Sequence, residues 1–412
     1  MAQLNITLDQ DEMLQLLAEN RPEAFRELLQ TSLNRILQAE SDEQLGAGRY
    51  ERSETRTDSR NGSRERQLST RIGRITLQVP RHRNEPFHSL VFDNYSRSES
   101  ALLATMAGMV VEGVASRKVS RVMEILCGTS FSKSTVSAVC RDLDKDVQAF
   151  RDRPLTEEYP FVMVDATYFK VRENHRVTGK ALMVALGTTA EGKREIIGFA
   201  VFPAETKDTW ETFLRSLRDR GLHGVSLITS DAHEGIVHAI SRVFPDAPWQ
   251  RCQTHFSRNI LSHAPKQYQT AIHDELQDLY RCDTIEQARR KRDEIIREYQ
   301  DVAEKAMQCL DDGFEDAMII LIFPKSLRRF FRTSNHLERL NRELKRRSNV
   351  IGVFPNEASL VRLMGSVLLE LQDRYTANSL VRFSREEASQ LPALAVHLRE
   401  AAAEQHKLLP AA

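Results

Sequence analysis

The sequence predicts a mixed α/β core that follows a mainly helical amino-terminal region. Three apolar segments with short connections occupy positions 161–202, and their β-branched and aromatic content favours strands. An amphipathic helical segment at 208–221, an apolar segment ending at Asp231 and a second amphipathic helical segment follow. Three strands, a helix, a strand and a helix is the element order of a ribonuclease-H-like α/β core with a mixed sheet.

The beginning of the chain combines a helical segment with a basic one. Apolar residues recur near the helical period between positions 8 and 40. Residues 48–66 are rich in Arg and in turn formers, so they are expected to form a mobile basic loop. Alternating apolar residues at 69–83 predict one or two short strands that Pro80 closes.

The helical stretch that follows contains a helix-turn-helix pattern. One helix is expected to end near Gly128, and Ser132 can cap the next one. The first turns of this second helix carry Lys133 and Ser134, which could face DNA in the major groove. Two ordinary helices joined at a glycine give the same pattern, so a purely structural helix pair stays open as an alternative.

The chain is expected to fold as several regions. A charge-rich helical stretch without strand signals interrupts the core as an all-α insertion, and the end of the chain is helical too. The expected regions are an N-terminal helical segment at 1–45, a basic loop with short strands at 46–95, a helix-turn-helix-like DNA-binding region at 96–155, a catalytic core at 156–260 and 325–375, the all-α insertion at 261–324 and a helical tail at 376–412.

Composition is typical of a soluble globular protein. Of the 412 residues, 41% are apolar and 28% are charged. No apolar run reaches the roughly 20 residues of a membrane span, and the first residues lack the order of a secretion signal. The five cysteines are odd in number and scattered, which disfavours a disulfide framework. We therefore expect a cytoplasmic protein without a membrane partner.

The formal net charge is zero, but the charge is unevenly distributed. Residues 48–83 contain ten Arg against four Asp plus Glu, and residues 325–347 contain nine Lys plus Arg against two Glu. Such patches suit a protein that binds a polyanion, because each cation placed at a phosphate releases condensed counterions. Ordinary enzymes also carry basic patches, so charge alone leaves a nucleic-acid partner undecided.

Three acidic residues stand out by position. Asp165 follows four apolar residues in the first expected strand, Asp231 closes the fourth strand, and Glu338 lies on a basic helix. If the first and fourth strands are neighbours, Asp165 and Asp231 meet at one end of the sheet, where open α/β sheets place their ligands. Paired carboxylates bind hard cations, so the three acids predict a site for two Mg²⁺ or Mn²⁺ ions. Each acid taken alone could equally be structural.

The helix expected at 333–347 presents Glu338 among cations. Four of its polar residues are spaced by three, four and three positions, which places them on one face. They are Asn335, Glu338, Arg342 and Lys345. A plain ion pair between Glu338 and Arg342 is the alternative to a catalytic role. Glu343 is a rival third acid, but it points away from that face. The cations expected to meet the DNA backbone are Arg339, Arg342, Lys345 and Arg346.

Four motifs occur in a fixed order: "VDATYFKVR", "TSDAHEGI", "WQRCQTHFSRN" and "SNHLERLNRELKRRSNVIGVFPN". Together they resemble the Mutator-type transposases of bacterial insertion sequences, of the DDE class, and the resemblance covers most of the chain. It implies that Asp165 and Asp231 are the two catalytic aspartates. It also implies that Glu338 is the third acid and that Lys345 is the basic residue seven positions on. The chain has Ala232 where family members often have Gly.

Cys252 and His255 match the Cys-x-x-His pair that the same family carries after its second aspartate. A zinc site normally has four ligands, and no second Cys/His pair in the sequence has a matching spacing. The pair is therefore expected to order the loop beside the active site or to contact DNA, with Arg251 and Arg258 nearby. Asn335, which opens the Asn-x-x-Glu-Arg motif, is expected to be auxiliary to the site.

The acids and the resemblance together imply a metal-dependent DNA transposase. The N-terminal half is expected to bind the terminal inverted repeats of an insertion sequence. The core is expected to hydrolyse a phosphodiester and to join the freed 3′-hydroxyl to target DNA. Synapsis of two ends implies at least a homodimer on double-stranded DNA. Two alternatives stay open: a structure-specific nuclease or resolvase on the same fold, and a catalytically inactive DNA-binding regulator.

Overall fold

The computed structural model describes residues 22–51, 53, 55–70, 72–89, 100–127, 131–378 and 383–408. The chain divides into two compact units, Met1–Leu143 and Asp144–Ala412. The part of the expected N-terminal helical segment before residue 22 lies outside the described residues. Among the helices of the described residues, none is long and apolar enough to cross a membrane.

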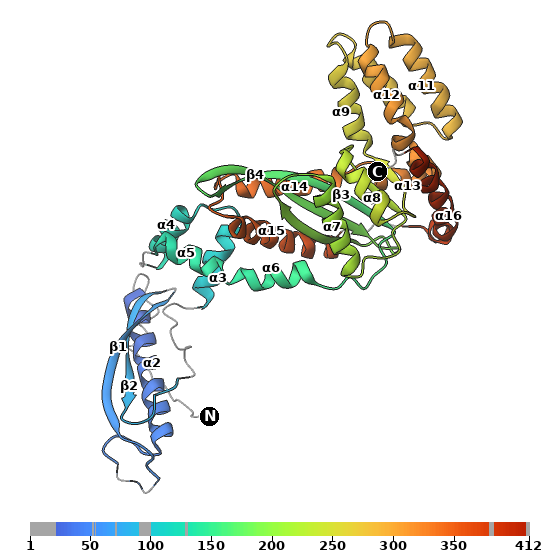
Figure 1. Ribbon diagram of the computed structural model, residues 1–412. Coiled ribbons are helices and arrows are strands. Elements are labelled where there is room, and N and C mark those ends of the chain that lie inside the picture. The colour runs from blue at the N-terminus through green and yellow to red at the C-terminus, as the bar shows by residue number, and fades with distance from the viewer. Residues whose placement is uncertain are drawn as a thin grey trace. The chain divides into compact units, whose positions relative to one another are not determined.

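The first unit begins with a helix packed on a two-stranded ribbon (Figure 1). Helix α2 (Pro22–Leu45) packs against β2 (Gly73–His82), which pairs antiparallel with β1 (Arg60–Thr70). The buried residues between them are Leu37, Leu68, Ile75, Leu77 and Val79. The side-chain oxygens of Gln30 and Asn34 accept backbone N–H groups of β2 at 3.1 and 2.8 Å. Helix α2 therefore also covers the outer edge of β2, which would otherwise be open to pairing.

Two expectations for this ribbon are wrong. Residues 60–66 belong to β1 and not to a mobile loop. Most of their side chains are polar and exposed, so the apolar alternation that marks a strand is missing there. Pro80 does not close the strand, because it lies inside β2 opposite Ser63. The pairing register is irregular next to this position, and a proline without an N–H is tolerated at such places.

Three short helices complete the first unit. They are α3 (Ser100–Val111), α4 (Ser116–Cys127) and α5 (Lys133–Cys140), and they share an apolar cluster. The hydroxyl of Ser132 accepts a backbone N–H of the first turn of α5 at 3.0 Å, which confirms the predicted cap. Gly128 lies outside the described residues.

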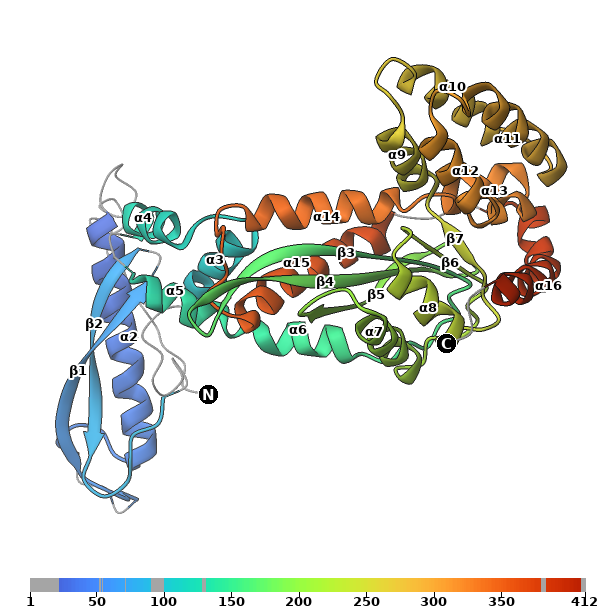
Figure 2. The same cartoon turned by 45° about the horizontal axis from the view of Figure 1, so that its top comes forward.

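The second unit is built on a five-stranded mixed sheet (Figure 2). Its strands are β3 (Phe161–Glu173), β4 (Arg176–Thr188), β5 (Arg194–Phe202), β6 (Leu227–Ser230) and β7 (Trp249–Arg251). The strand order is β5-β4-β3-β6-β7. The first three pair antiparallel, whereas β6 is parallel to β3 and β7 is parallel to β6. The first and fourth strands are thus neighbours, and the short β7 is a strand that the sequence did not predict.

Helices cover both faces of this sheet (Figure 2). Helices α7 (Lys207–Asp219) and α8 (Glu234–Val243) share one apolar cluster with the sheet. Helix α15 (Glu357–Asn378) packs against β5 and β3. Gly198 of β5 faces α7, whereas Phe199, its neighbour in the strand, faces α15. Because neighbouring strand residues point to opposite faces, α7 and α15 lie on opposite sides of the sheet.

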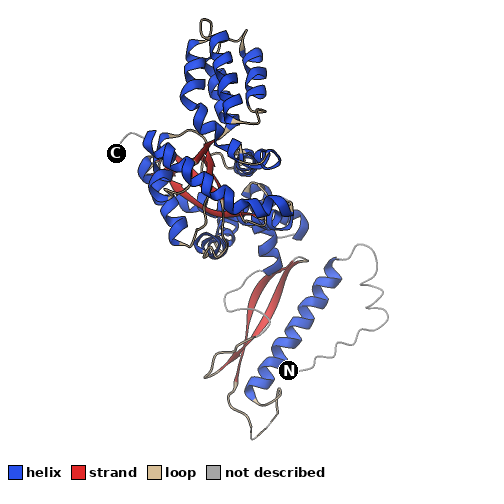
Figure 3. Cartoon of the chain, turned by 90° about the vertical axis from the view of Figure 1, so that its right-hand side faces the viewer, coloured by secondary structure: helices blue, strands red, loops and turns tan. Residues whose placement is uncertain are grey.

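The chain is helical from Gln253 to Met318, apart from short turns, over a range that the structure describes fully (Figure 3). The helices are α9 (Gln253–His263), α10 (Gln269–Leu279), α11 (Ile285–Tyr299) and α12 (Glu304–Met318). They enclose an apolar core of their own. An all-α segment was expected here, although α9 starts before the expected boundary at residue 261.

The second unit contains further helices besides those that cover the sheet and those of the all-α segment. They are α6 (Leu143–Asp152), the 3₁₀ helix η1 (Ile319–Ile322), α13 (Lys325–Phe331), α14 (Asn335–Ser348) and α16 (Arg385–Leu408).

The helix expected at 208–221 begins one residue earlier and ends two residues earlier. Helix α7 begins at Lys207 from a capping box of Thr206 and Thr209, and Asp208 lies in its first turn.

Candidate active site

Asp165 and Asp231 lie at the same edge of the sheet. Strands β3 and β6 run parallel, with Met163 opposite Thr229. Strand β6 ends at Ser230, but the same register continued for two positions places Asp231 beside Asp165, and the charge of Asp231 is close enough to raise the pKa of Asp165. The predicted meeting of these two acids rests on this register. Ligands of open α/β sheets bind at such carboxyl ends of parallel strands.

The surroundings of Asp165 disfavour its negative charge. Its side chain is buried, with 8% of the residue exposed. Burial, and then the nearby charge of Asp231, raise the pKa of Asp165 to about 7. Asp231 has one carboxylate oxygen, Oδ1, that is buried and has no hydrogen-bond partner among the described residues. Two neighbouring acids with little access to water favour the binding of a proton or a cation.

Asn341 belongs to this site, although the sequence did not single it out. It lies on α14, and its Nδ2 donates a hydrogen bond of 2.8 Å to Oδ2 of Asp165. Val162 and Val164 face the cluster around α7 and α8, so strand alternation turns Asp165 toward the other face, where α14 lies. One signal was present in the sequence: Asn341 follows Glu338 by three positions and therefore shares its helix face.

Glu338 is bound by two cationic side chains of α9. Its Oε1 accepts a hydrogen bond of 2.9 Å from Arg258 and lies 3.3 Å from Nε2 of His255. The alternative partner, Arg342, forms no ion pair with it among the described residues. No group of three or more His, Cys, Asp or Glu side chains in this part of the chain is arranged to hold a metal ion. The structure thus brings two of the three acids together, whereas the third, Glu338 of α14, is bound to side chains of α9.

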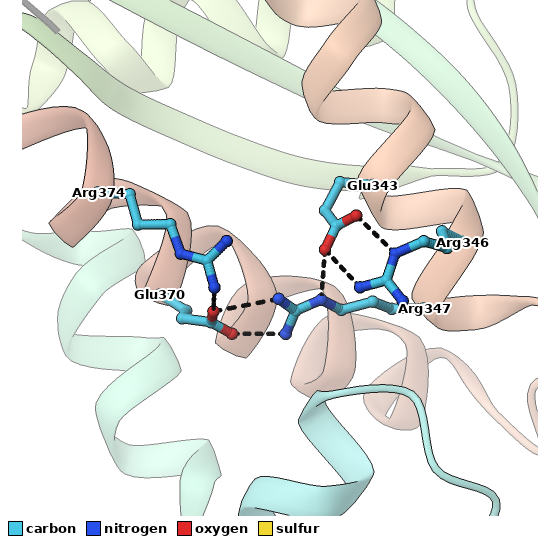
Figure 4. Close-up of polar contacts among 5 residues, drawn as sticks. All are labelled: Glu343, Arg346, Arg347, Glu370 and Arg374. Carbon is cyan, nitrogen blue, oxygen red and sulfur yellow. Dashed lines mark hydrogen bonds and ion pairs between the residues drawn. The ribbon is translucent and has the colours of Figure 1, made fainter. Parts of the chain in front are cut away.

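Glu343, the rival third acid, is occupied by arginines (Figure 4). Its two oxygens accept hydrogen bonds of 2.7 Å from Arg346 and one of 2.8 Å from Arg347. Hydrogen bonds from Arg346 and then Arg347 lower the pKa of Glu343 to about 2. Arg347 is almost fully buried and also binds Glu370 of α15. Glu343 therefore holds Arg347, which joins α14 to α15.

Cys252 and His255 connect the starts of α9 and α14. The sulfur of Cys252 accepts hydrogen bonds of 3.3 Å from the backbone N–H and from the hydroxyl of Ser334. Burial opposes ionisation of the thiol, but contacts with His255 and the hydrogen bonds from Ser334 outweigh it and lower the pKa of Cys252. The same contact with Cys252 raises the pKa of His255 to about 9. This geometry agrees with a pair that orders the loop beside the acids.

Comparison with known proteins decides the family. The model of the family described as "Transposase, Mutator family" matches residues 1–378. The chain belongs to the Mutator family of transposases. It is 39% identical to the transposase of insertion sequence element IS256 in transposon Tn4001 from Staphylococcus aureus, over 93% of this chain and 100% of that protein. It is also 39% identical to the IS1081 transposase of Mycobacterium tuberculosis, over 87% of each chain. The ISRM5 transposase of Rhizobium meliloti is 36% identical, over 86% of this chain and 89% of the relative.

Most cations that the sequence singled out in this transposase are exposed. On α14, Arg339, Arg342 and Lys345 are exposed and have no acidic partner among the described residues. Arg346 is also exposed, but it binds Glu343. At the other end of the same helix face, Asn335 is exposed and accepts a long hydrogen bond of 3.4 Å from Thr254. Three exposed cations on one helix form a surface suited to phosphates.

The other proposed DNA contacts differ from one another in their surroundings. Arg251 is half-buried and lies over the ring of Phe256 at 4.4 Å, so its guanidinium serves in packing. In the first unit, Lys133 and Ser134 are exposed at the start of α5. The hydroxyl of Ser134 hydrogen-bonds to Ser132 at 2.6 Å. Contacts of these residues with DNA stay predictions.

Proposed function

We propose that this chain is a metal-dependent DDE transposase in which Asp165, Asp231 and Glu338 act on one phosphodiester. The observation that carries the proposal is the parallel register of β3 and β6, which makes the two aspartates neighbours. The raised pKa of Asp165 supports it, because a site that disfavours two negative charges favours a divalent cation between them.

A ribonuclease-H-like core is the fold that we propose for the second unit. Its support is an antiparallel meander of three strands followed by two parallel strands, in the order β5-β4-β3-β6-β7. Helix α7 lies in the connection from β5 to β6. Helix α14 packs against β3 and follows the all-α insertion in the chain. In a core of this topology, acids far apart in the chain would come to one sheet edge.

The residues present fit a hard cation. Asp165 and Asp231 offer carboxylate oxygens, and the buried Oδ1 of Asp231 has no donor among the described residues. Oxygen ligands of this kind suit Mg²⁺ or Mn²⁺ better than Zn²⁺. Two such ions, when bound, would activate the attacking hydroxyl and stabilise the leaving oxygen. The protein's part is to hold the carboxylates in place and to align the DNA.

Glu338 would complete this site after it leaves Arg258 and His255. The Arg258 side chain is 62% exposed, so a DNA phosphate can reach it and compete with the carboxylate of Glu338. DNA binding and closure of the acid site would then be coupled through a single exchange of ion-pair partners. Arg258 thereby takes the role of a phosphate contact that the sequence predicted for it.

Double-stranded DNA is the partner that we propose for the basic surfaces. The exposed cations of α14 would contact the phosphates near the acids, and Lys133 and Ser134 would contact the terminal inverted repeats. Handling two element ends and a target in one reaction requires at least a homodimer. Water and a DNA 3′-hydroxyl would be alternative nucleophiles, so hydrolysis and strand transfer need only one site.

The test uses full-length protein and duplexes that carry the inverted repeats flanking its gene. We expect wild type to nick the element end and to join it to a second duplex in Mg²⁺ or Mn²⁺. Asp231→Asn should bind the same duplex and do neither. Asp246→Asn changes an exposed aspartate elsewhere on the surface and should be fully active. Cutting without joining would indicate a nuclease, and binding without cutting in either ion would indicate a regulator.

A further inference from the structure

Asn341 links helix α14 directly to the acid pair. Only 9% of the residue is exposed, and its Nδ2 donates to Oδ2 of Asp165 at 2.8 Å. The other oxygen of that carboxylate accepts the backbone N–H of Ala166 at 2.9 Å. Both oxygens of Asp165 therefore have a fixed donor, and one of the two donors comes from the helix that also carries Glu338.

Acceptor oxygens are in excess around this contact. Oδ1 of Asn341 and Oδ1 of Asp231 are both buried, and neither has a hydrogen-bond partner among the described residues. A buried acceptor without a donor is unfavourable, so such an oxygen normally meets a water, a proton or a cation. Two of them near one carboxylate indicate that a positively polarised group belongs there.

The orientation of the amide follows from its neighbour. With Asp165 ionised, turning the Asn341 amide over would place its oxygen against a carboxylate oxygen and leave its nitrogen without an acceptor. While Asp165 is ionised, as it is when it holds a cation, Nδ2 therefore faces Asp165 and Oδ1 faces elsewhere. The unsatisfied oxygen is thus a consequence of the contact that holds Asp165.

We propose that Asn341 is a further residue of the cation site, with Nδ2 positioning the carboxylate of Asp165 and Oδ1 serving as a neutral oxygen ligand. Amide oxygens are common ligands of hard cations. A neutral ligand raises the number of donors without adding a further negative charge to the carboxylates of the site. This inference rests on the proposed metal dependence and assigns a role to a residue outside the three acids.

Two substitutions at this position separate the proposed role from a structural one. Asn341→Ala removes both the donor to Asp165 and the oxygen. Asn341→Asp keeps an oxygen ligand but places a third carboxylate beside Asp165 in the absence of metal. Asn349→Ala is the matched control, because Asn349 is an exposed asparagine at the end of the same helix.

The measurement is the binding of Mn²⁺ to full-length protein, followed by the electron paramagnetic resonance signal of the free ion, with and without a duplex oligonucleotide. We expect Asn341→Ala to raise the dissociation constant for Mn²⁺ by roughly 10–100-fold. Asn341→Asp should bind Mn²⁺ at least as tightly as wild type, and Asn349→Ala should be unchanged. In a chelator, the melting temperature of Asn341→Asp should be lower than that of wild type. Added Mn²⁺ should raise the melting temperature of Asn341→Asp by more than it raises that of wild type.

Two outcomes would overturn the inference. One is an Asn341→Ala protein that binds Mn²⁺ like wild type, even if it melts at a lower temperature. The other is an Asn341→Asp protein that binds Mn²⁺ as weakly as Asn341→Ala. Asp231→Asn distinguishes this failure from failure of the proposed function. If Asp231→Asn loses Mn²⁺ binding while Asn341→Ala keeps it, only the role of Asn341 is contradicted. If Asp231→Asn keeps Mn²⁺ binding, the proposed cation site itself is contradicted.

Discussion

The buried carboxylate of Asp165 carries an electrostatic penalty. Burial and the neighbouring Asp231 raise its pKa to about 7, above its ordinary value of 3.8. Between these two values the folded protein holds a proton that the unfolded chain releases. Stability that is fully present at low pH is therefore lost as pH rises toward and through 7. A cation would remove this loss, because it favours the ionised form.

This linkage predicts how Asp165→Asn behaves. The amide mimics the protonated acid and can still accept the hydrogen bond from Asn341. In a chelator, we expect the variant to gain stability over wild type as pH rises, by about 2–3 kcal/mol between pH 5 and pH 8. Mg²⁺ should reduce or reverse that gain at pH 8. Denaturant unfolding at both pH values measures the free energy of unfolding of the two proteins, with Asp246→Asn as control. A stability difference between variant and wild type that does not change with pH would contradict the prediction.

At the scale of elements, α14 is fixed at both ends by polar contacts. Near its start Glu338 binds α9, and at its middle Asn341 binds β3. Near its end, Arg347 lies between Glu343 and Glu370, with 1% of its side chain exposed (Figure 4). The functional face of the helix is thus positioned by an ion-pair network that takes no part in the proposed chemistry.

The network at the end of α14 gives a prediction with an internal control. Arg347→Ala leaves two carboxylates without their shared buried cation, so we expect the free energy of unfolding to fall by about 3–5 kcal/mol. Arg374 binds the same Glu370, but its side chain is 60% exposed. Arg374→Ala should therefore change stability by no more than about 1 kcal/mol. Urea unfolding of both variants measures this, and equal losses would show that burial does not control the network.

The elements differ in how well the sequence predicted them. Strands β3 to β6 were predicted because their apolar residues are continuous or alternate, and their order suggested which strands would be neighbours. The first part of β1, residues 60–66, was missed because most of its side chains are polar and exposed, so it lacks the apolar alternation that marks a strand. Asn341 was missed because its spacing of three positions from Glu338 was the one sequence signal, and its contact with Asp165 arises only when α14 packs against β3. Contacts between distant segments, such as that of Glu338 with Arg258, leave no periodic pattern in the sequence, so they could not be predicted from it.

At the scale of the whole molecule, zero net charge coexists with concentrated basic surfaces. Elsewhere in the described part of the molecule, acids and cations neutralise one another locally, as in the ion pairs between α11 and α12. A protein of this kind can bind a polyanion locally without the self-repulsion of a uniformly basic chain. DNA affinity should then depend on particular cations and not on total charge.

The salt dependence of DNA binding tests whether particular cations, and not total charge, determine the affinity for DNA. Each phosphate contact contributes about 0.9 to the slope of log affinity against log salt concentration. We expect Arg342→Ala and Lys345→Ala each to reduce the slope by about 1. Arg290→Ala removes an equal charge from an exposed position on α11 and should leave the slope unchanged. Fluorescence anisotropy with a labelled duplex, from about 50 to 200 mM salt, gives all three slopes. Equal effects at all three positions would mean that net charge and not the α14 surface governs binding, because a delocalised attraction responds to any removed cation alike.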